Sequence, residues 1–179
     1  MNGCVLMQTP NGVWRKKLTI EQSRNVAFNI MDLDKWPQWN STAQRILSES
    51  RGKLNEGNRF DLHRLERQQL IEEMWEVTKI REGKNPEFTE MRFNWLGQTS
   101  NGKKSGNALR TLTLEITVLC QDEGGIEIAA WWQTSKWSRI FGNKVANSAK
   151  QIAKQWLNDL AENGVIEIKQ ISQKVYEEE

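Results

Sequence analysis

Residues 138–163, SRIFGNKVANSAKQIAKQWLNDLAEN, form the one long amphipathic stretch of the chain. Apolar residues recur along it at helical spacing, with Lys, Gln and Asn between them. These apolar residues are Phe141, Val145, Ala149, Ile152, Trp156 and Leu160. Asn163 and Gly164 provide a suitable C-terminal stop. A helix of this kind needs an apolar partner surface, because packing supplies most of its stability.

The segments before this helix predict that partner surface. They alternate in hydrophobicity and are rich in β-branched and aromatic residues, which is typical of strands. The predicted strands cover residues 43–49, 58–65, 70–81, 88–96, 108–120 and 125–134. Short turns containing Gly, Asn and Pro separate them, so an antiparallel meander is expected rather than βαβ units. The polar residues 97–107 are predicted to form a mobile loop, a candidate lid over a ligand site.

The chain begins with a different pattern. Residues 13–20 alternate and predict a first strand. Ser23 can cap a short helix over residues 24–31, and residues 32–37 are expected to end it. A second short helical turn over residues 36–42 is expected to follow directly. The expected order is therefore α+β: a strand, two short helices, the meander and the long helix. This is a helix-grip layout, a curved antiparallel sheet of about seven strands around a long C-terminal helix.

Specific motifs strengthen this expectation. Residues 25–32, NVAFNIMD, and 36–40, WPQWN, resemble the VW-x-L-x-D and WP-x-W-N motifs that begin START-like proteins. Residues 57–60, GNRF, are similar to the family's G-x-x-F strand opening, and 74–80, MWEVTKI, to its x-x-V-T-E-V strand. The family is the START-like (SRPBCC) superfamily, which includes polyketide cyclase/dehydrase, lipid-transfer and pollen-allergen-like proteins.

The resemblance covers residues 13–163 and implies a helix-grip fold with an internal cavity. The chain departs from the motifs at Phe28, where Trp is usual, and in the longer polar loop at 98–106. The superfamily contains carriers, cyclases, hydrolases and heat-shock regulators, so the resemblance predicts the fold and leaves the activity open.

Length and composition fit one domain. The chain has 179 residues, 37% hydrophobic and 27% charged, with no linker or repeat dividing it. We expect an N-terminal extension at 1–12, the START-like domain at 13–163 and a frayed tail at 164–179. The whole chain has 25 basic and 23 acidic residues, which leaves a formal charge of +2, so no nucleic-acid partner is expected. Without a membrane-length apolar run or a leader of secretory type, the expected location is cytoplasmic.

The residues available for chemistry are few. The chain has one His, and its two cysteines, Cys4 and Cys120, do not have metal-ligand spacing. Phosphate loops, nucleophile elbows and HExxH motifs are absent from the sequence. No metal and no cofactor are therefore expected.

Strand alternation predicts which residues line a pocket under the long helix. The ligand-contacting residues are expected to be Phe60, Leu62, Trp75, Met91, Phe93, Trp95, Leu112, Leu114, Ile128, Trp132, Ile152 and Trp156. Large aromatic side chains stack on flat rings, so an aromatic, polyketide-like or lipid-like ligand would suit them. These residues could instead fill the interior as a core, because the chain has nine tryptophans and large aromatic residues are common in cores.

Three polar residues are candidate catalytic groups. Glu73 and Arg110 share the predicted apolar face, where they could pair with each other or act on a ligand. The resemblance to cyclases suggests an oxyanion role for a pocket arginine such as Arg110. Arg64, on the face of Phe60, is a fourth polar residue that could lie in the pocket or at the surface, but it is not one of these three candidates. His63 could exchange protons near neutral pH, but it is predicted on the outer face. Strand-end or surface placement is the alternative for each of them.

The leading hypothesis is a protein that binds a hydrophobic small molecule in its helix-grip pocket. A second hypothesis is a biosynthetic cyclase/dehydratase that uses Arg110, Glu73 or His63 without metal. A third is a ligand-free interaction or co-chaperone-like module, in which Trp131, Trp132 and Trp137 form an exposed patch for a partner or a homodimer.

Overall fold

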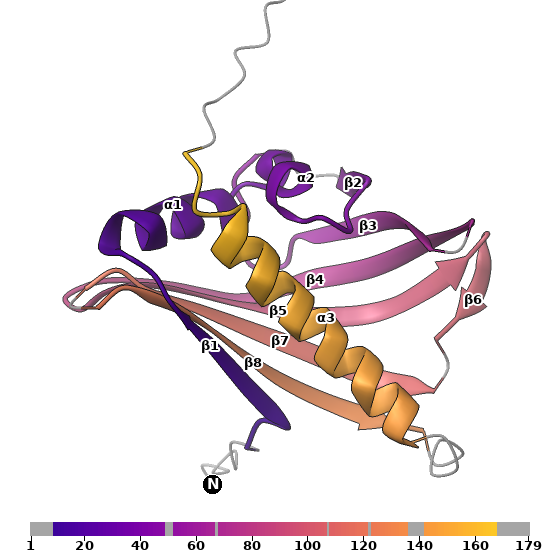
Figure 1. The fold of residues 1–179 in the computed structure, drawn as a ribbon. Helices are drawn as coiled ribbons and strands as arrows, with labels where there is room; N and C mark the ends of the chain where they lie inside the picture. Colours follow the sequence, from indigo (N-terminus) through magenta and orange to yellow (C-terminus); the bar gives the residue numbers. More distant parts are fainter. Residues whose placement is uncertain are drawn as a thin grey trace, which may run out of the picture.

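One antiparallel sheet curves around the long helix α3 in the computed structural model, which describes residues 9–48, 52–66, 68–106, 108–121, 123–135 and 142–167 (Figure 1). The strand order is β1-β8-β7-β5-β4-β3-β2, and β6 pairs with β5. The strands are β1 (Gly12–Lys17), β2 (Arg45–Ser48), β3 (Arg59–Glu66), β4 (Gln69–Lys84), β5 (Glu87–Ser100), β6 (Lys103–Ser105), β7 (Leu109–Leu119) and β8 (Gly125–Thr134). The helices are α1 (Ile20–Ile30), the 3-10 helix η1 (Leu33–Lys35), α2 (Trp36–Trp39) and α3 (Gly142–Glu162). The α+β helix-grip prediction is confirmed.

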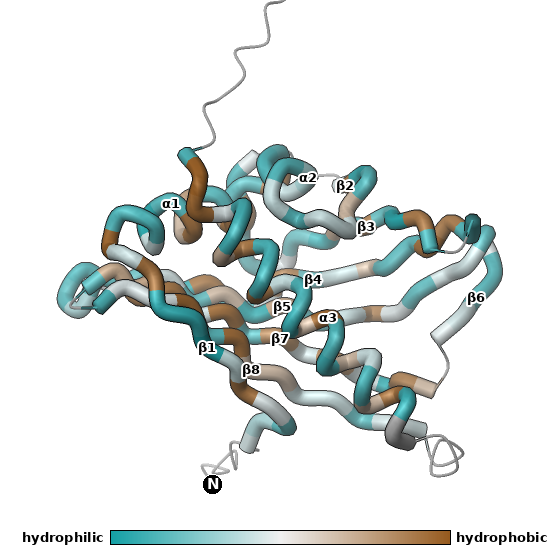
Figure 2. Tube along the Cα trace, viewed as in Figure 1, coloured by the Kyte–Doolittle hydropathy of each residue, from teal (hydrophilic) through white to brown (hydrophobic). Residues whose placement is uncertain are grey.

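Helix α3 crosses the concave face of the sheet obliquely (Figure 1). It packs against β8, β1 and β7 and against α2 near its C-terminal end. Figure 2 shows hydrophobic and hydrophilic residues alternating along it, and Ala149, Trp156 and Leu160 are at most 2% exposed, as the spacing predicts. The helix was expected to begin at Ser138, but residues 136–141 lie outside the described residues.

Helix α1 begins earlier than expected. Thr19, not Ser23, is its N-cap: Thr19 Oγ1 accepts from the Gln22 backbone N–H at 3.2 Å. The Gln22 Oε1 atom accepts from the Thr19 N–H at 2.9 Å, which completes a capping box. Ser23 is buried inside the helix. The T-x-x-Q pattern extends the helix by a full turn and places Arg24 in its body.

The segment predicted as a mobile loop, residues 97–107, is largely a hairpin. Strand β5 continues to Ser100 and turns at Asn101 and Gly102, whose φ angles are +48° and +74°. Strand β6 then pairs back onto β5. The Asn-Gly turn chemistry outweighs the polarity of the segment, because this turn type needs positive φ at both central residues.

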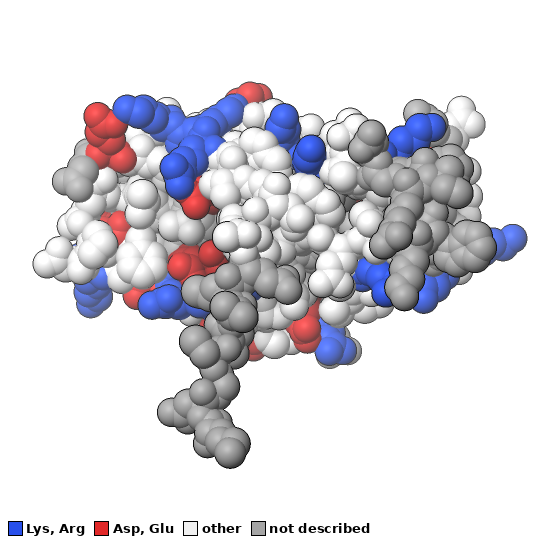
Figure 3. All heavy atoms as spheres, turned by 90° about the horizontal axis from the view of Figure 1, so that it is seen from below, with Lys and Arg blue, Asp and Glu red and all other residues white. Residues whose placement is uncertain are grey.

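The first residues of the predicted tail are tied to α1. The side-chain amide of Asn29 donates to the carbonyls of Gly164 at 2.8 Å and Ile166 at 2.9 Å. The Asn25 amide donates to the Val165 carbonyl at 3.0 Å. These bonds satisfy backbone carbonyls beyond the end of α3 and join the two ends of the domain. Figure 3 shows Lys and Arg among Asp and Glu on the face it draws, as expected of a nearly balanced charge.

Aromatic rings fill the interior between α2, the sheet and α3. Trp36 lies at their centre, with ring centroids 5.0 Å from Trp39, 5.0 Å from Phe60, 5.5 Å from Phe93 and 5.2 Å from Trp156. Most of these pairs have the edge-to-face geometry that aromatic quadrupoles favour. The Trp36 indole N–H donates to the Ile30 carbonyl at 3.0 Å, so its polar atom is buried with a partner.

Replacing Trp36 with alanine is expected to lower the free energy of unfolding by about 3–5 kcal/mol, because it leaves a cavity shared by all three layers. Urea unfolding followed by circular dichroism measures the loss. Leu119→Ala is the control, since Leu119 is 46% exposed and its truncation should cost less than about 0.5 kcal/mol. A cost for Trp36→Ala as small as that of the control would contradict the central role of this ring.

Candidate functional site

An open pocket of about 670 Å³ lies between α3 and the sheet, beside the aromatic core. Its apolar lining comes from Trp95 on β5, Leu109 on β7, and Val145, Ile152 and Trp156 on α3. We call it the α3 pocket. It is on the side of α3 that faces β3, β4 and β5, whereas the helix itself packs on β8, β1 and β7.

Hydrogen bonds hold the helix in place above the pocket. Asp159, only 4% exposed, accepts through Oδ2 from the backbone N–H of Ser41 at 3.0 Å and from its hydroxyl at 2.9 Å. The other carboxylate oxygen accepts from the Gln155 amide at 2.9 Å. The connection after α2 is thereby bonded to the C-terminal half of α3. This arrangement fixes the position of Gln155 and Trp156, which line the pocket.

A buried carboxylate and a guanidinium form the polar wall of the α3 pocket. Glu73 on β4 is 3% exposed, and its Oε1 accepts from Arg64 Nε at 3.1 Å and Nη2 at 3.0 Å. Arg64 Nη1 donates to Glu66 Oε2 at 2.6 Å. The Trp75 indole N–H makes a longer contact to Glu73 Oε2, at 3.4 Å. Inward alternation on neighbouring strands brings Arg64 and Glu73 to the same wall.

Burial raises the pKa of Glu73, because removing the carboxylate from water disfavours its charged form. The charge and hydrogen bonds of Arg64 oppose this effect only in part. A carboxyl group with a raised pKa beside an apolar cavity can hold or release a proton nearer neutral pH than a free glutamate can.

Eight of the residues predicted to contact a ligand lie in the core and do not border the pocket. Each is at most 2% exposed: Phe60, Leu62, Trp75, Met91, Phe93, Leu112, Leu114 and Ile128. They face inward as strand alternation predicts, but they pack against one another and against the helices. This part of the interior is the filled core that the sequence analysis left open as an alternative.

Trp95, Ile152 and Trp156 are the predicted ligand residues that do line the α3 pocket. Trp132 is half-buried and packs against the core without bordering the pocket. Its neighbour Trp131 has the Arg92 guanidinium 5.6 Å from its ring centroid, so it takes part in a contact of the outer face. Trp137, the third residue of the predicted apolar patch, lies outside the described residues.

The expectation that Arg110 faces the pocket is wrong. The pairing of β7 with β8 shifts register between Leu109 and Thr111, and Arg110 is exposed at this irregularity. A bulge of this kind breaks the period-2 rule from which the expectation came. The arginine that borders the pocket is Arg64. His63 is half-buried on β3 between inward-facing neighbours and pairs in register with Glu72, and it does not border the pocket.

Several lining residues were not anticipated from the sequence. Gln98, Ser148, Gln151 and Gln155 border the α3 pocket although they belong to polar stretches. Glu66, which completes the ion-pair cluster with Arg64, was also missed. The signal available was the shared face of Arg64 and Glu73, since two opposite charges inside an apolar alternation are expected to pair.

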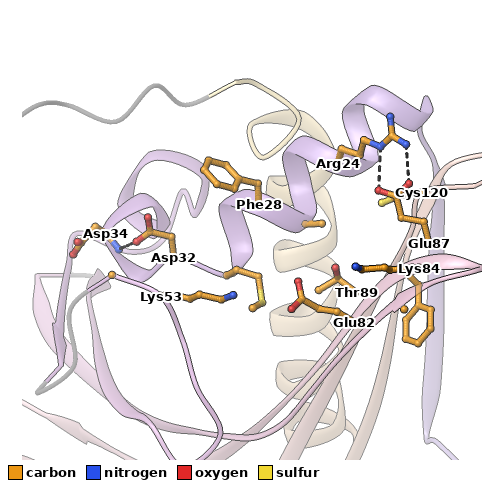
Figure 4. A pocket seen from close by; sticks show the side chains of 15 residues that line it. Arg24, Phe28, Asp32, Asp34, Lys53, Glu82, Lys84, Glu87, Thr89 and Cys120 are labelled. Carbon is orange, nitrogen blue, oxygen red and sulfur yellow. Dashed lines mark hydrogen bonds and ion pairs between the residues drawn. The ribbon is translucent and has the colours of Figure 1, made fainter.

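A second pocket, of about 1000 Å³, opens between α1 and the β4–β5 hairpin (Figure 4). Charges of both signs surround it. Arg24 donates to both carboxylate oxygens of Glu87, at 3.1 and 2.7 Å, and these bonds lower the pKa of Glu87. Burial raises the pKa of the Cys120 thiol in its wall. Lys35, beside this region, has its ammonium 3.2 Å from the Phe28 ring centroid.

The described residues contain no group of three or more His, Cys, Asp or Glu side chains placed to hold a metal ion. Among the same residues, no helix is both long and apolar enough to cross a membrane.

Comparison with the sequence profiles of known protein families finds no match, and comparison with curated proteins finds none. Solved structures do match. Ara h 8.0201 aligns over 84% of this chain and 95% of its own, with a TM-score of 0.60 and 12% identity. The chain has the helix-grip fold. A hypothetical protein from Helicobacter pylori aligns over 88% of this chain and 89% of its own, with a TM-score of 0.60 and 16% identity.

A third match is the di-domain ARO/CYC protein BexL, with a TM-score of 0.60 and 8% identity. It aligns over 85% of this chain but 46% of its own length, so this helix-grip domain corresponds to about half of BexL. The matches confirm the helix-grip fold that the sequence predicts.

The raised pKa of Glu73 predicts a specific dependence of stability on pH. The folded chain binds the Glu73 proton more tightly than the unfolded chain, so this residue's contribution to stability falls as the pH rises from 4.5 through the raised pKa. Glu73→Gln cannot ionise. Over this interval the stability of the wild type is therefore expected to decline relative to that of the variant.

Urea unfolding at a series of pH values measures the difference. Glu66→Gln is the matched control, because Glu66 belongs to the same cluster but its side chain is 52% exposed. Parallel pH profiles for the wild type and Glu73→Gln would contradict the prediction, because they would show that Glu73 has the same proton affinity in the folded and unfolded chains.

Proposed function

We propose that this protein binds an apolar, ring-containing small molecule in the α3 pocket. The observation that carries the proposal is an open volume of about 670 Å³ between α3 and the sheet, directly beside a core that is densely packed with rings. Volumes of several hundred Å³ are typical of small-molecule sites, and the walls of this one combine apolar side chains with many polar ones. Trp95, Ile152 and Trp156 offer apolar surface, and Arg64 and Glu73 offer the polar groups.

Structural likeness supports a ligand-binding use of the fold without identifying the ligand. The ARO/CYC protein BexL comes from a biosynthetic pathway. The START-like resemblance of the motifs includes carriers as well as cyclases. A carrier needs only volume and access, whereas a cyclase needs a group in the pocket that moves protons. The α3 pocket has the volume, so binding is the activity that its geometry supports best.

Native mass spectrometry of the freshly purified protein, followed by solvent extraction, is the first test. A co-purifying apolar or ring-containing compound would support the proposal and give its chemical class. Calorimetric titration with naphthalene-based probes extends the test to protein that is purified without a ligand. A clean protein mass together with no binding of such probes would contradict the proposal.

Filling the α3 pocket is expected to abolish binding. In Ile152→Trp the larger side chain extends from a half-buried position on α3 into the open volume, so probe affinity should fall at least about tenfold, or 1.4 kcal/mol. Ala27→Trp is the matched control: it introduces the same side chain into the second pocket, which Ala27 lines, and should leave affinity unchanged. Loss of binding in Ala27→Trp alone would move the ligand site to the second pocket.

A second candidate function is proton transfer by Glu73, and the raised pKa of this buried carboxyl group is the observation that favours it. The reaction class would be removal and return of a proton beside a carbonyl group of the bound molecule, as in cyclase/dehydratase chemistry. Arg110 and His63 do not border the α3 pocket, so the proposal rests on Glu73 alone.

Exchange of the α protons of 2-tetralone in deuterated buffer, followed by NMR, tests this second function. The wild type is expected to accelerate exchange by about 10² or more, and Glu73→Gln is expected to lose that acceleration. Glu82→Gln, in the second pocket, serves as the control carboxylate. Equal exchange rates with the wild type and with Glu73→Gln would exclude Glu73 as the proton-transfer group for this probe.

A further inference from the structure

The arginine of the α3 pocket is already occupied by the protein's own carboxylates. Arg64 Nε and Nη2 donate to Glu73 Oε1, at 3.1 and 3.0 Å, and Nη1 donates to Glu66 at 2.6 Å. These bonds use three of the five N–H groups of the guanidinium, and a ligand carboxylate bound to the remaining two would lie beside the negative charges of both glutamates. The pocket is therefore poorly suited to the anionic group that an arginine would otherwise attract.

Glu73 retains capacity to accept hydrogen bonds. A carboxylate has about four lone-pair positions on its two oxygens. Arg64 uses Oε1 twice, while the contact that the described residues make to Oε2 is the long one from Trp75, at 3.4 Å. When the cluster is ionised, two carboxylates face one guanidinium, which leaves one net negative charge. Water screens the part of this charge on Glu73 least, because Glu73 is 3% exposed, whereas the Glu66 side chain is 52% exposed.

The positive charges of α3 that line the same pocket lie at its solvent-facing rim. Lys144 and Lys154 are both exposed, and neither ammonium group forms an ion pair with Glu66 or Glu73 among the described residues. Water and salt screen such exposed charges. The excess negative charge of the pocket therefore lies in its interior, and the positive charges of the lysines lie at its rim. Trp95 and Trp156 line the same pocket as Glu73.

We infer that the ligand of the α3 pocket is a ring-containing amine whose ammonium group contacts Glu73 Oε2 and whose ring system lies against Trp95 and Trp156. An ammonium group supplies a second, charge-assisted hydrogen bond to Oε2, beside the long one from Trp75, and neutralises the excess charge of the cluster. Tryptophan rings attract cations through their π faces, so the aromatic wall favours the same ligand. This inference rests on the proposed binding function and specifies its chemistry.

Calorimetric titration with three ligands of the same ring and similar length tests the inference on the unmodified protein. The ligands are 2-(1-naphthyl)ethylamine, 2-(1-naphthyl)ethanol and 1-naphthylacetate, at neutral pH and physiological salt. The amine is expected to bind at least about tenfold more tightly than the alcohol, and the acetate more weakly than the alcohol. Glu73→Gln should remove the advantage of the amine and leave alcohol binding in place.

Two controls locate the effect. Glu82→Gln removes a carboxylate from the second pocket and should leave the order of the three ligands unchanged. Ile152→Trp should weaken all three ligands together. Near-UV circular dichroism establishes whether each variant is folded. If Glu73→Gln does not fold, the comparison of the three ligands on the wild type still decides the inference.

Each outcome has a distinct meaning. Equal affinities for amine and alcohol, or tightest binding of the acetate, would overturn the amine inference and leave apolar binding in the pocket intact. An amine advantage that persists in folded Glu73→Gln would also overturn it, because the charge would then be recognised elsewhere. Failure of all three ligands to bind would count against the proposed function itself.

Discussion

The indole ring of Trp36 is where the helices and the sheet of this domain meet. Phe60 and Phe93 reach it from the sheet, Trp39 from α2 and Trp156 from α3. Close packing of rings on one side chain fixes the C-terminal half of α3 at van der Waals distance from the layers around it. Bonds from Ser41 to Asp159 and from Gln155 to Ser41 hold the same half of the helix. Helix α3 also packs against β8 and β1, and the α3 pocket is the space left on its side facing β3, β4 and β5.

The polar wall of that pocket has an energetic cost that packing alone would not require. Burying Glu73 removes a carboxylate from water, and Arg64 compensates for that loss only in part, as the raised pKa shows. An apolar pair of similar volume would often be at least as stable. Charged groups retained at such a cost beside an open cavity are a common property of binding and catalytic sites. This argument directs both functional proposals to the same carboxyl group.

Hydrophobic alternation and helical periodicity predicted much of the architecture. They failed where irregular strand pairing, or the packing of segments distant in sequence, decides where a side chain lies. Alternation placed Trp75 and Leu114 in the interior, and it put Arg64 and Glu73 on the inward faces of adjacent strands. The same rule wrongly predicted that Arg110 faces the pocket. The irregular pairing of β7 with β8 interrupts the alternation at this residue, so its side chain is exposed. For residues 97–107 the polarity of the segment predicts a loop, but the Asn-Gly turn makes a hairpin. The T-x-x-Q capping box at Thr19 is visible in the sequence and begins α1 one turn before Ser23.

The sequence by itself determined the order of the elements, the antiparallel sheet, the amphipathic helix that covers it and most of the faces that turn inward. Periodicities of 2 and 3.6 residues specify which side chains of a strand or helix point to the same face, and this direction is a local property of the chain. Only the tertiary structure decided that Phe60 and Phe93 are core while Trp95 and Ile152 border an open volume. Whether an inward side chain meets a neighbour or a cavity depends on the separation of segments distant in sequence. Here that separation follows from the ring packing around Trp36 and from the oblique path of α3 across the sheet.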